Sequence, residues 1–151
     1  MIDILMATYN GERYLEEQLM SIENQTWKAW RLIVHDDAST DGTWRILEEF
    51  QRRHGASKVV IKKNSPASGG AKANFIGLIK ESSGRYMMCC DQDDVWHPDK
   101  VAETFRRMRQ MEQRYGKELP LLVHTDLRVV DEALSEIDPG FHAYMNLRTD
   151  G

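Results

Sequence analysis

Carboxylates gather in two short segments of the sequence, each directly after an apolar run. Segment 36–42 reads DDASTDG and segment 91–94 reads DQDD, while a polar turn, TYNG, follows an earlier apolar run at 8–11. Two like charges about 4 Å apart repel by about 1 kcal/mol in water and by about 4 kcal/mol at an effective dielectric constant of about 20. We therefore expect the cluster to be relieved by a bound cation or by raised pKa values.

The oxygen-rich composition of these segments indicates which cation would fit. All-oxygen ligand sets select hard ions such as Mg²⁺ or Mn²⁺. Mg²⁺ in particular is commonly held by one or two carboxylates together with the phosphates of a substrate. The pattern therefore points to a ligand that carries a diphosphate. A D-x-D motif alone is weak evidence, because Asp is common in solvated turns.

The elements before these segments decide whether they can meet. Apolar runs alternate with stretches in which apolar residues recur at helical spacing. The runs predict strands at 2–7, 32–34, 59–61, 86–90 and 121–123. The periodic stretches predict helices within 12–25, after 39–41, around 75–79 and from 98 toward 115. Apolar strands that alternate with helices are typical of an α/β fold with a mostly parallel, doubly wound sheet and helices on both faces.

In such a sheet, ligands bind beyond the carboxyl ends of the strands. Parallel strands all point the same way, so the three polar segments should lie on one edge of the sheet. We therefore expect Tyr9, Asp37 and Asp93 to share a pocket.

Size and composition indicate one globular domain over residues 1–151. The chain is 41% hydrophobic and 29% charged, with 4 Pro and 10 Gly, which does not fit disordered or collagen-like classes. The formal net charge is −4 and the basic residues are scattered, which argues against nucleic acid as a partner.

The cysteines and the apolar runs bear on the compartment. Cys89 and Cys90 are adjacent on a predicted strand, so they should point to opposite faces, and we expect reduced, buried thiols. No run approaches the roughly 20 apolar residues that a membrane-spanning helix needs. We expect a cytoplasmic protein, and peripheral association with the inner face of the membrane stays open.

The three polar segments, taken in order and spacing, resemble family 2 glycosyltransferases of the GT-A fold, a Rossmann-like architecture. The resemblance rests on ATYN at 7–10, DDASTDGT at 36–43 and DQDDVW at 91–96, and it spans nearly the whole chain. The run through Trp96 and the later segment HTDL at 124–127 are most similar to bacterial rhamnosyltransferases and related polysaccharide enzymes.

The resemblance implies a role for several residues in holding a nucleoside-diphosphate sugar of the UDP or TDP type. Tyr9, with Thr8 and Asn10 beside it, would lie against the nucleobase, and Asp37 would hydrogen-bond the uracil or thymine ring. Asp91 would contact the ribose or the metal, and Asp93 would coordinate the Mg²⁺ or Mn²⁺ ion that bridges the phosphates. Simpler interpretations remain: Tyr9 and Asn10 as turn residues, Asp36 as a solvated or capping acid, and Asp41 as a helix N-cap.

Weaker signals concern Lys72 and the histidines. Lys72 follows Gly69 and Gly70 at an expected helix start, where free amides attract phosphate, but an ordinary helix start explains it equally well. The histidines show no paired metal-ligand spacing, so we assign none of them a catalytic role.

The resemblance implies an inverting transfer of a sugar, with rhamnose suggested, to a saccharide or lipid-linked acceptor in surface polysaccharide synthesis. In the family the catalytic base follows well after the D-x-D strand. Asp126 and Asp131 are the late acids near a predicted strand end, and neither matches the context of that base. We expect the N-terminal part of a longer enzyme, and a non-catalytic nucleotide-binding module is the alternative. A phosphoacceptor receiver domain fits poorly, because it would have one acid alone after its central strand.

Overall fold

A computed structural model describes residues 1–147 of the chain. The chain divides into two compact units, Met1–Ala102 and Glu103–Gly151. The three polar segments all belong to the first unit.

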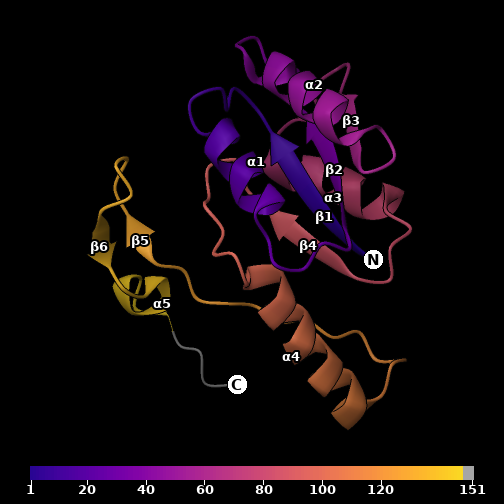
Figure 1. Cartoon of the computed structure of the whole chain (residues 1–151), viewed down its shortest axis with the longest axis vertical. Coiled ribbons are helices and arrows are strands. Elements are labelled where there is room, and N and C mark those ends of the chain that lie inside the picture. Colours follow the sequence, from indigo (N-terminus) through magenta and orange to yellow (C-terminus); the bar gives the residue numbers. More distant parts are fainter. Residues whose placement is uncertain (148–151) are drawn as a thin grey trace. The chain divides into compact units, whose positions relative to one another are not determined.

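The first unit is built on a four-stranded parallel sheet (Figure 1). Its strands are β1 (Ile2–Thr8), β2 (Trp30–Asp36), β3 (Val59–Lys63) and β4 (Met87–Cys90). They lie in the order β3-β2-β1-β4, and all three neighbouring pairs are parallel. The register pairs Thr8 at the end of β1 with Asp36 at the end of β2. The predicted parallel α/β sheet is confirmed.

Position in the sheet explains the burial of each strand. β1 and β2 occupy the centre and are buried along nearly their whole length, whereas the edge strands β3 and β4 are buried at only one residue each. Strands covered on both faces read as continuous apolar runs, which is why the two central strands were the clearest in the sequence.

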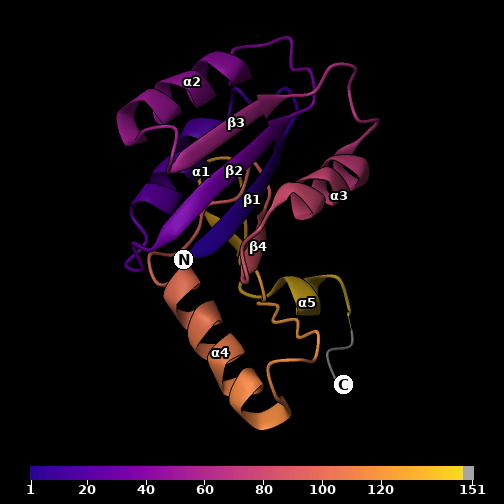
Figure 2. The same cartoon turned by 90° about the vertical axis from the view of Figure 1, so that its right-hand side faces the viewer.

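Helices cover both faces of this sheet. α1 (Leu15–Glu23) and α2 (Thr43–His54) lie on one face and α3 (Ala71–Glu81) lies on the other (Figures 1 and 2). On the α3 side, a core of Leu5, Ile33 and Leu78 joins helix and sheet. Each helix follows a strand, so its start lies near the edge where the polar segments collect.

The second unit contains most of α4 (Lys100–Tyr115), a hairpin of β5 (Val129–Val130) and β6 (Glu136–Asp138), and the short helix α5 (Phe141–Tyr144). The predicted strand at 121–123 is wrong, because the described residues 1–147 form no strand there and Leu122 is 85% exposed. An apolar run of three residues is too short to define a strand without a hydrogen-bonded neighbour.

The two cysteines differ in their surroundings. As predicted, adjacent positions on β4 send them to opposite faces: Cys90 is buried and Cys89 is exposed. The expectation that both thiols are buried is therefore wrong for Cys89, because β4 is an edge strand in this structure. Burial raises the pKa of the Cys90 thiol well above its ordinary value.

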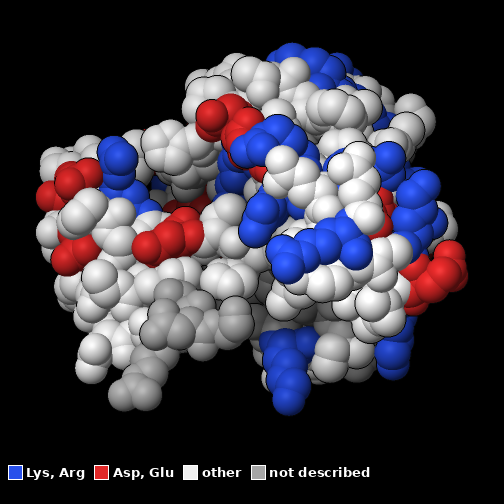
Figure 3. All heavy atoms as spheres, turned by 90° about the horizontal axis from the view of Figure 1, so that it is seen from below, with Lys and Arg blue, Asp and Glu red and all other residues white. Residues whose placement is uncertain are grey.

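The surface carries charges of both signs. Acidic, basic and uncharged side chains share the face drawn in Figure 3, in keeping with 20 basic and 24 acidic residues in the whole chain. Among residues 1–147, no helix is both long enough and apolar enough to cross a membrane.

Candidate functional site

A pocket of about 500 Å³ opens at the edge of the sheet where β1, β2 and β4 end. This volume lies within the range of roughly 300–1,000 Å³ that is usual for small-molecule sites. Five of the predicted site residues line it: Thr8, Tyr9, Asp37, Asp91 and Asp93. Asn10 and Lys72 are not among its lining residues. The expected gathering of Tyr9, Asp37 and Asp93 in one pocket is therefore confirmed.

Thr8 and Asp36 fix the end of the two central strands beneath the pocket. The buried Thr8 hydroxyl donates to Asp36 Oδ1 at 3.1 Å. Asp36 is fully buried and also accepts from the Ser39 backbone at 3.0 Å and the Ser39 hydroxyl at 2.5 Å. Asp36 is thus buried and holds the start of the β2–α2 loop; it is not solvated, and it does not cap α2, whose N-cap is Gly42.

Asn10 fastens two loops together. Its Oδ1 accepts from the Thr40 backbone N–H at 2.9 Å, and its own N–H donates to Ser39 Oγ at 2.9 Å. Its φ of 47° is the left-handed conformation that Asn tolerates better than most residues. These contacts give Asn10 the turn-building role that the sequence left as an alternative to ligand contact.

Tyr9 presents its side chain at the mouth of the pocket, where it is 59% exposed. Its backbone is held by Gln92, the middle residue of the D-x-D motif. The Tyr9 N–H donates to Gln92 Oε1 at 2.9 Å, and Gln92 Nε2 donates to the Tyr9 carbonyl at 3.1 Å. The β4–α4 loop therefore holds the β1–α1 loop directly.

Asp37 is buried and supported by hydrogen-bond donors. Asn64 Nδ2 donates to its Oδ1 at 3.0 Å, and the Ser68 backbone N–H donates to the same oxygen at 2.5 Å. Burial by itself would raise the pKa of Asp37, but these hydrogen bonds outweigh it, so the pKa lies below its ordinary value. Asp37 is an ionised acceptor at neutral pH.

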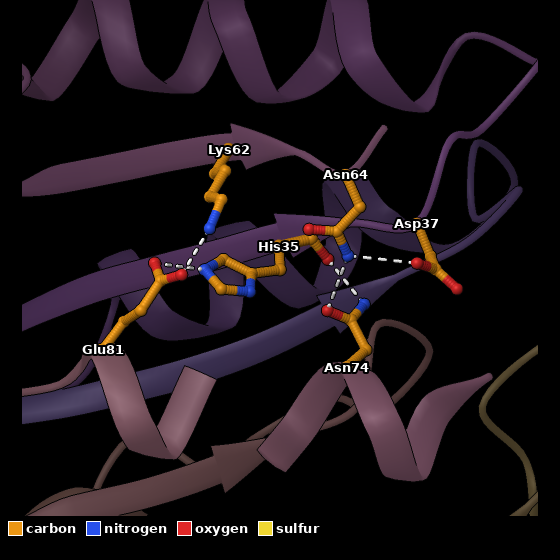
Figure 4. A network of polar contacts seen from close by, with 6 residues as sticks. All are labelled: His35, Asp37, Lys62, Asn64, Asn74 and Glu81. Atoms are coloured by element: carbon orange, nitrogen blue, oxygen red, sulfur yellow. Dashed lines mark hydrogen bonds and ion pairs between the residues drawn. The ribbon is translucent and has the colours of Figure 1, made fainter. Parts of the chain in front are cut away.

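A chain of side-chain amides ties Asp37 to α3 (Figure 4). Asn64 also donates to Asn74 Oδ1 at 3.2 Å, and Asn74 Nδ2 donates to the His35 carbonyl at 2.9 Å. The His35 ring lies 3.0 Å from Glu81, which also contacts Lys62. Buried His35 therefore has the structural role expected of a strand histidine.

The three acids of the D-x-D loop act on one another. Burial and the Asp93 carboxylate raise the pKa of Asp91. Burial and the carboxylates of Asp91 and Asp93 raise the pKa of Asp94, against the attraction of Lys100. The repulsion predicted for this cluster is therefore present in the folded chain.

The donor set suits an ion that is shared with a ligand. Among residues 1–147, no three His, Cys, Asp or Glu side chains are placed to hold a metal ion together. Asp91 and Asp93 nevertheless line the pocket side by side. One or two carboxylates completed by phosphate oxygens are the set that Mg²⁺ prefers.

The start of α3 also contributes to the lining of the pocket. Gly70 and Ala71 line the pocket, and Gly70 precedes the helix with a φ of 128°. The first turn of α3 thus borders the pocket, in the position where helix amides attract phosphate. Lys72 lies in that turn, is exposed, and does not line the pocket; its role in phosphate binding stays a prediction.

Comparison with known proteins agrees with this geometry. Residues 3–114 match the family model described as "Glycosyl transferase family 2". This chain belongs to glycosyl transferase family 2. The matched range includes every predicted donor-site residue, from Thr8 to Asp93.

Named bacterial glycosyltransferases resemble the chain over about two thirds of its length or slightly more. It is 43% identical over 99 residues to the dTDP-rhamnosyl transferase RfbG of Shigella flexneri, covering 64% of this chain and 34% of RfbG. It is 31% identical over 110 residues to TuaG of Bacillus subtilis, a putative teichuronic acid biosynthesis glycosyltransferase, covering 73% of this chain and 42% of TuaG. The chain thus spans well under half the length of these relatives.

Solved structures support the family 2 fold. Staphylococcus aureus TarS residues 1–349, in complex with UDP, superpose with a TM-score of 0.62 and 22% identity, covering 85% of this chain and 41% of TarS. The Pyrobaculum calidifontis mannosyltransferase PcManGT, in complex with GDP-Man and Mn²⁺, superposes with a TM-score of 0.61 and 24% identity, covering 70% of this chain and 31% of PcManGT. At these identities the likeness establishes the GT-A fold.

The late acids that the sequence analysis weighed as a base are engaged in turns. Asp126 accepts from the Leu127 and His142 backbones at 2.8 and 3.0 Å, and these hydrogen bonds lower its pKa. Asp131 accepts from the Ala133 and Ser135 backbones, both at 2.9 Å. The lowered pKa of Asp126 does not favour proton abstraction at neutral pH.

Gln92, Asn64 and Asn74 support residues of the pocket, and sequence reasoning missed them. Gln92 stands inside the D-x-D motif, and this position was the available signal. Asn64 follows β3 and Asn74 lies in the first turn of α3, but nothing in their local sequence indicates that Asn64 contacts Asp37 or that Asn74 contacts Asn64.

Proposed function

We propose that this chain is the donor-binding part of a glycosyltransferase that inverts the anomeric centre as it transfers a sugar from a nucleoside diphosphate. The donor is of the UDP or TDP type, and the acceptor is a saccharide or lipid-linked sugar in surface polysaccharide synthesis. One observation carries the proposal: Tyr9, Asp37, Asp91 and Asp93 line a single pocket although they come from three separate loops.

Each residue has a role that suits its surroundings. The exposed Tyr9 ring stacks on the nucleobase, since an aromatic face binds any planar base. Ionised Asp37 accepts a hydrogen bond from the imide N–H of uracil or thymine. At the other end of the pocket, Asp91 contacts the ribose or the ion, and Asp93 binds the ion beside the diphosphate.

The transfer itself needs groups at both ends of the diphosphate. Asp93 and Asp91 would hold Mg²⁺ or Mn²⁺, which supplies charge compensation on the departing diphosphate when bound. The amides at the start of α3 would support the same phosphates. The acceptor hydroxyl attacks the anomeric carbon from the opposite side while a carboxylate removes its proton.

The relatives support the finer assignments. RfbG is named a dTDP-rhamnosyl transferase, which favours rhamnose carried on TDP as the donor. Escherichia coli WfgD, 34% identical over 101 residues, is named for an acceptor linked to diphosphoundecaprenol, a lipid. A lipid-linked acceptor would place the enzyme in the cytoplasm at the inner face of the membrane.

Thermal unfolding with nucleotides tests the donor site. UDP or TDP with Mn²⁺, at 100 times the dissociation constant, should add about 2.7 kcal/mol and raise Tm by roughly 5–10 °C. EDTA or Asp93→Ala should remove most of this shift, while Asp99→Ala, at an exposed acid outside the pocket, should leave it intact. No shift with either nucleotide would refute the donor site.

A nucleotide-binding module without catalysis would share the same pocket. The turn roles of Asp126 and Asp131 favour this alternative for the isolated chain. Donor hydrolysis distinguishes the two, because it needs no knowledge of the acceptor. Release of free sugar from TDP-rhamnose or a UDP-sugar, lost in Asp93→Ala, would support the enzyme.

A further inference from the structure

The Gln92 side chain forms a pair of hydrogen bonds with the main-chain N–H and C=O of Tyr9, a residue 83 positions away. Tyr9 N–H donates to Gln92 Oε1 at 2.9 Å, and Gln92 Nε2 donates to the Tyr9 carbonyl at 3.1 Å. A primary amide can pair with both main-chain groups of one residue because it carries a donor and an acceptor. The two contacts hold the peptide units on both sides of the Tyr9 Cα, from which the ring projects.

Gly11 provides the space in which this amide lies. A Cβ added at Gly11 would stand 2.4 Å from Gln92 Oε1, 2.6 Å from Cδ and 3.1 Å from Nε2. Gly11 is itself fixed, because its N–H donates to Thr43 Oγ1 at 2.8 Å. Gly11 is not among the residues that line the pocket, and the group that its added Cβ would meet is the Gln92 amide.

The chemistry of the contact restricts the middle position of the motif. Asn is one methylene shorter than Gln, so its amide falls short of the peptide. Glu keeps an acceptor for the Tyr9 N–H, but its ionised form has no donor for the carbonyl. The residue between Asp91 and Asp93 therefore has a task that neither flanking acid can perform.

We propose that Gln92 is a positioning residue for nucleobase recognition: it holds the Tyr9 ring at a fixed place relative to Asp91 and Asp93, the acids on either side of Gln92. The inference rests on the proposed function, because it takes Tyr9 as the base-stacking residue. It couples the two ends of the donor site, since the loop that carries Asp91 and Asp93 also holds the base platform.

A double-mutant cycle of Gln92→Ala and Gly11→Ala tests the proposal. Gln92→Ala removes two hydrogen bonds and should weaken UDP or TDP by about tenfold. Gly11→Ala should weaken it by a similar factor, because the new methyl group displaces the same amide. In the Gln92→Ala background, Gly11→Ala should change the affinity by less than about twofold, because the Gln92 amide that the new methyl group would displace is already absent. Circular dichroism and Tm check that each variant folds.

Fragments of the ligand locate the effect. Uridine or thymidine should lose about the same factor as the nucleotide in Gln92→Ala, whereas pyrophosphate with Mn²⁺ should bind both proteins equally. A merely structural role would weaken all of these probes together. Independent, additive effects of the two substitutions, or equal loss of pyrophosphate binding, would overturn the proposal.

Gln92→Asn gives a second readout if either alanine variant folds poorly. Asn keeps the amide donor and acceptor but is one methylene shorter, so nucleoside affinity should fall as in Gln92→Ala while pyrophosphate with Mn²⁺ binds as in wild type. Full nucleoside affinity in Gln92→Asn would contradict the pairing with the Tyr9 main chain. If wild type binds pyrophosphate with Mn²⁺ but no nucleoside, the positioning proposal fails while an anion site survives; if wild type binds no probe, the proposed function fails as well.

Discussion

Two acidic loops meet at one pocket, and their carboxylates are held in opposite ways. In the β2–α2 loop, Asp37 is buried but receives hydrogen bonds from Asn64 and Ser68, which hold its pKa below the ordinary value. In the β4–α4 loop, burial and mutual repulsion raise the pKa values of Asp91 and Asp94.

The difference separates two kinds of binding. A carboxylate already satisfied by protein donors has a fixed orientation and one defined acceptor direction, which suits recognition of a flat base. Carboxylates that repel each other gain most from an added positive charge, which suits a metal ion and its phosphates. Sequence composition is similar in the two loops, so the neighbouring donors, rather than the acids, set the function.

The largest effect should come from Asp93→Ala. It removes a carboxylate from the shared ion, and we expect Mn²⁺-dependent binding of UDP or TDP to weaken roughly 100-fold. Titration calorimetry at fixed nucleotide, with and without Mn²⁺, measures it. Asp99→Ala is the matched control, five to eight residues from the motif acids and exposed. If nucleotide binding to Asp93→Ala depends on Mn²⁺ as strongly as binding to wild type, the β4–α4 loop has no special role in metal binding.

Asp37→Asn should produce the second largest effect. The amide keeps the shape and can still accept from Asn64 and Ser68, so the fold should survive. The loss of charge should weaken UDP or TDP by about tenfold, because hydrogen bonds to charged groups are stronger than neutral ones. Calorimetry with pyrophosphate and Mn²⁺ should show no change in this variant. An equal loss of pyrophosphate binding would contradict the assignment of the β2–α2 loop to the base and of the β4–α4 loop to the metal.

The positions of these loops were predictable from the sequence. Apolar runs at 2–7 and 32–34 fixed the central strands, and parallel strands bring their carboxyl ends to one edge. The run at 121–123 misled, because a short apolar stretch does not reveal whether a neighbouring strand is there to pair with it. The spatial order β3-β2-β1-β4 also has no local signature.

The contacts inside the loops were harder to predict. Asn10 fits either a ligand contact or a turn role in the sequence, and only the position of Thr40, 30 residues away, shows that its side chain joins two loops. The lowered pKa of Asp37 arises from hydrogen-bond donors that tertiary structure brings to it, whereas burial and the Asp93 carboxylate raise the pKa of Asp91. Side-chain pairs at such separations leave no periodic pattern along the chain.

Asp91→Asn should raise stability in the absence of metal. The pKa of Asp91 is raised in the folded chain, so its ionised form destabilises the fold as pH rises through the window between the unfolded and folded pKa values. Above that window, as at pH 7 in EDTA, the variant should melt higher than wild type. At a pH below both values the difference should vanish. Differential scanning fluorimetry across pH measures it, and a lower Tm at pH 7 would contradict the repulsion.

Asn64→Ala should give the smallest effect. It should lower stability at neutral pH, whereas Asp91→Asn should raise it. The lowered pKa of Asp37 contributes stability that is present above its unfolded pKa of about 3.9 and is lost as pH falls through the lower folded value. Without the Asn64 donor, the pKa of Asp37 in the folded chain moves up. The free energy of unfolding at neutral pH should therefore fall by about 1 kcal/mol. Urea unfolding at pH 7 and at pH 3 measures this, and the difference between variant and wild type should shrink at the lower pH. If Asn64→Ala lowers stability equally at both pH values, Asn64 acts through Asn74 and α3 rather than through the Asp37 carboxylate.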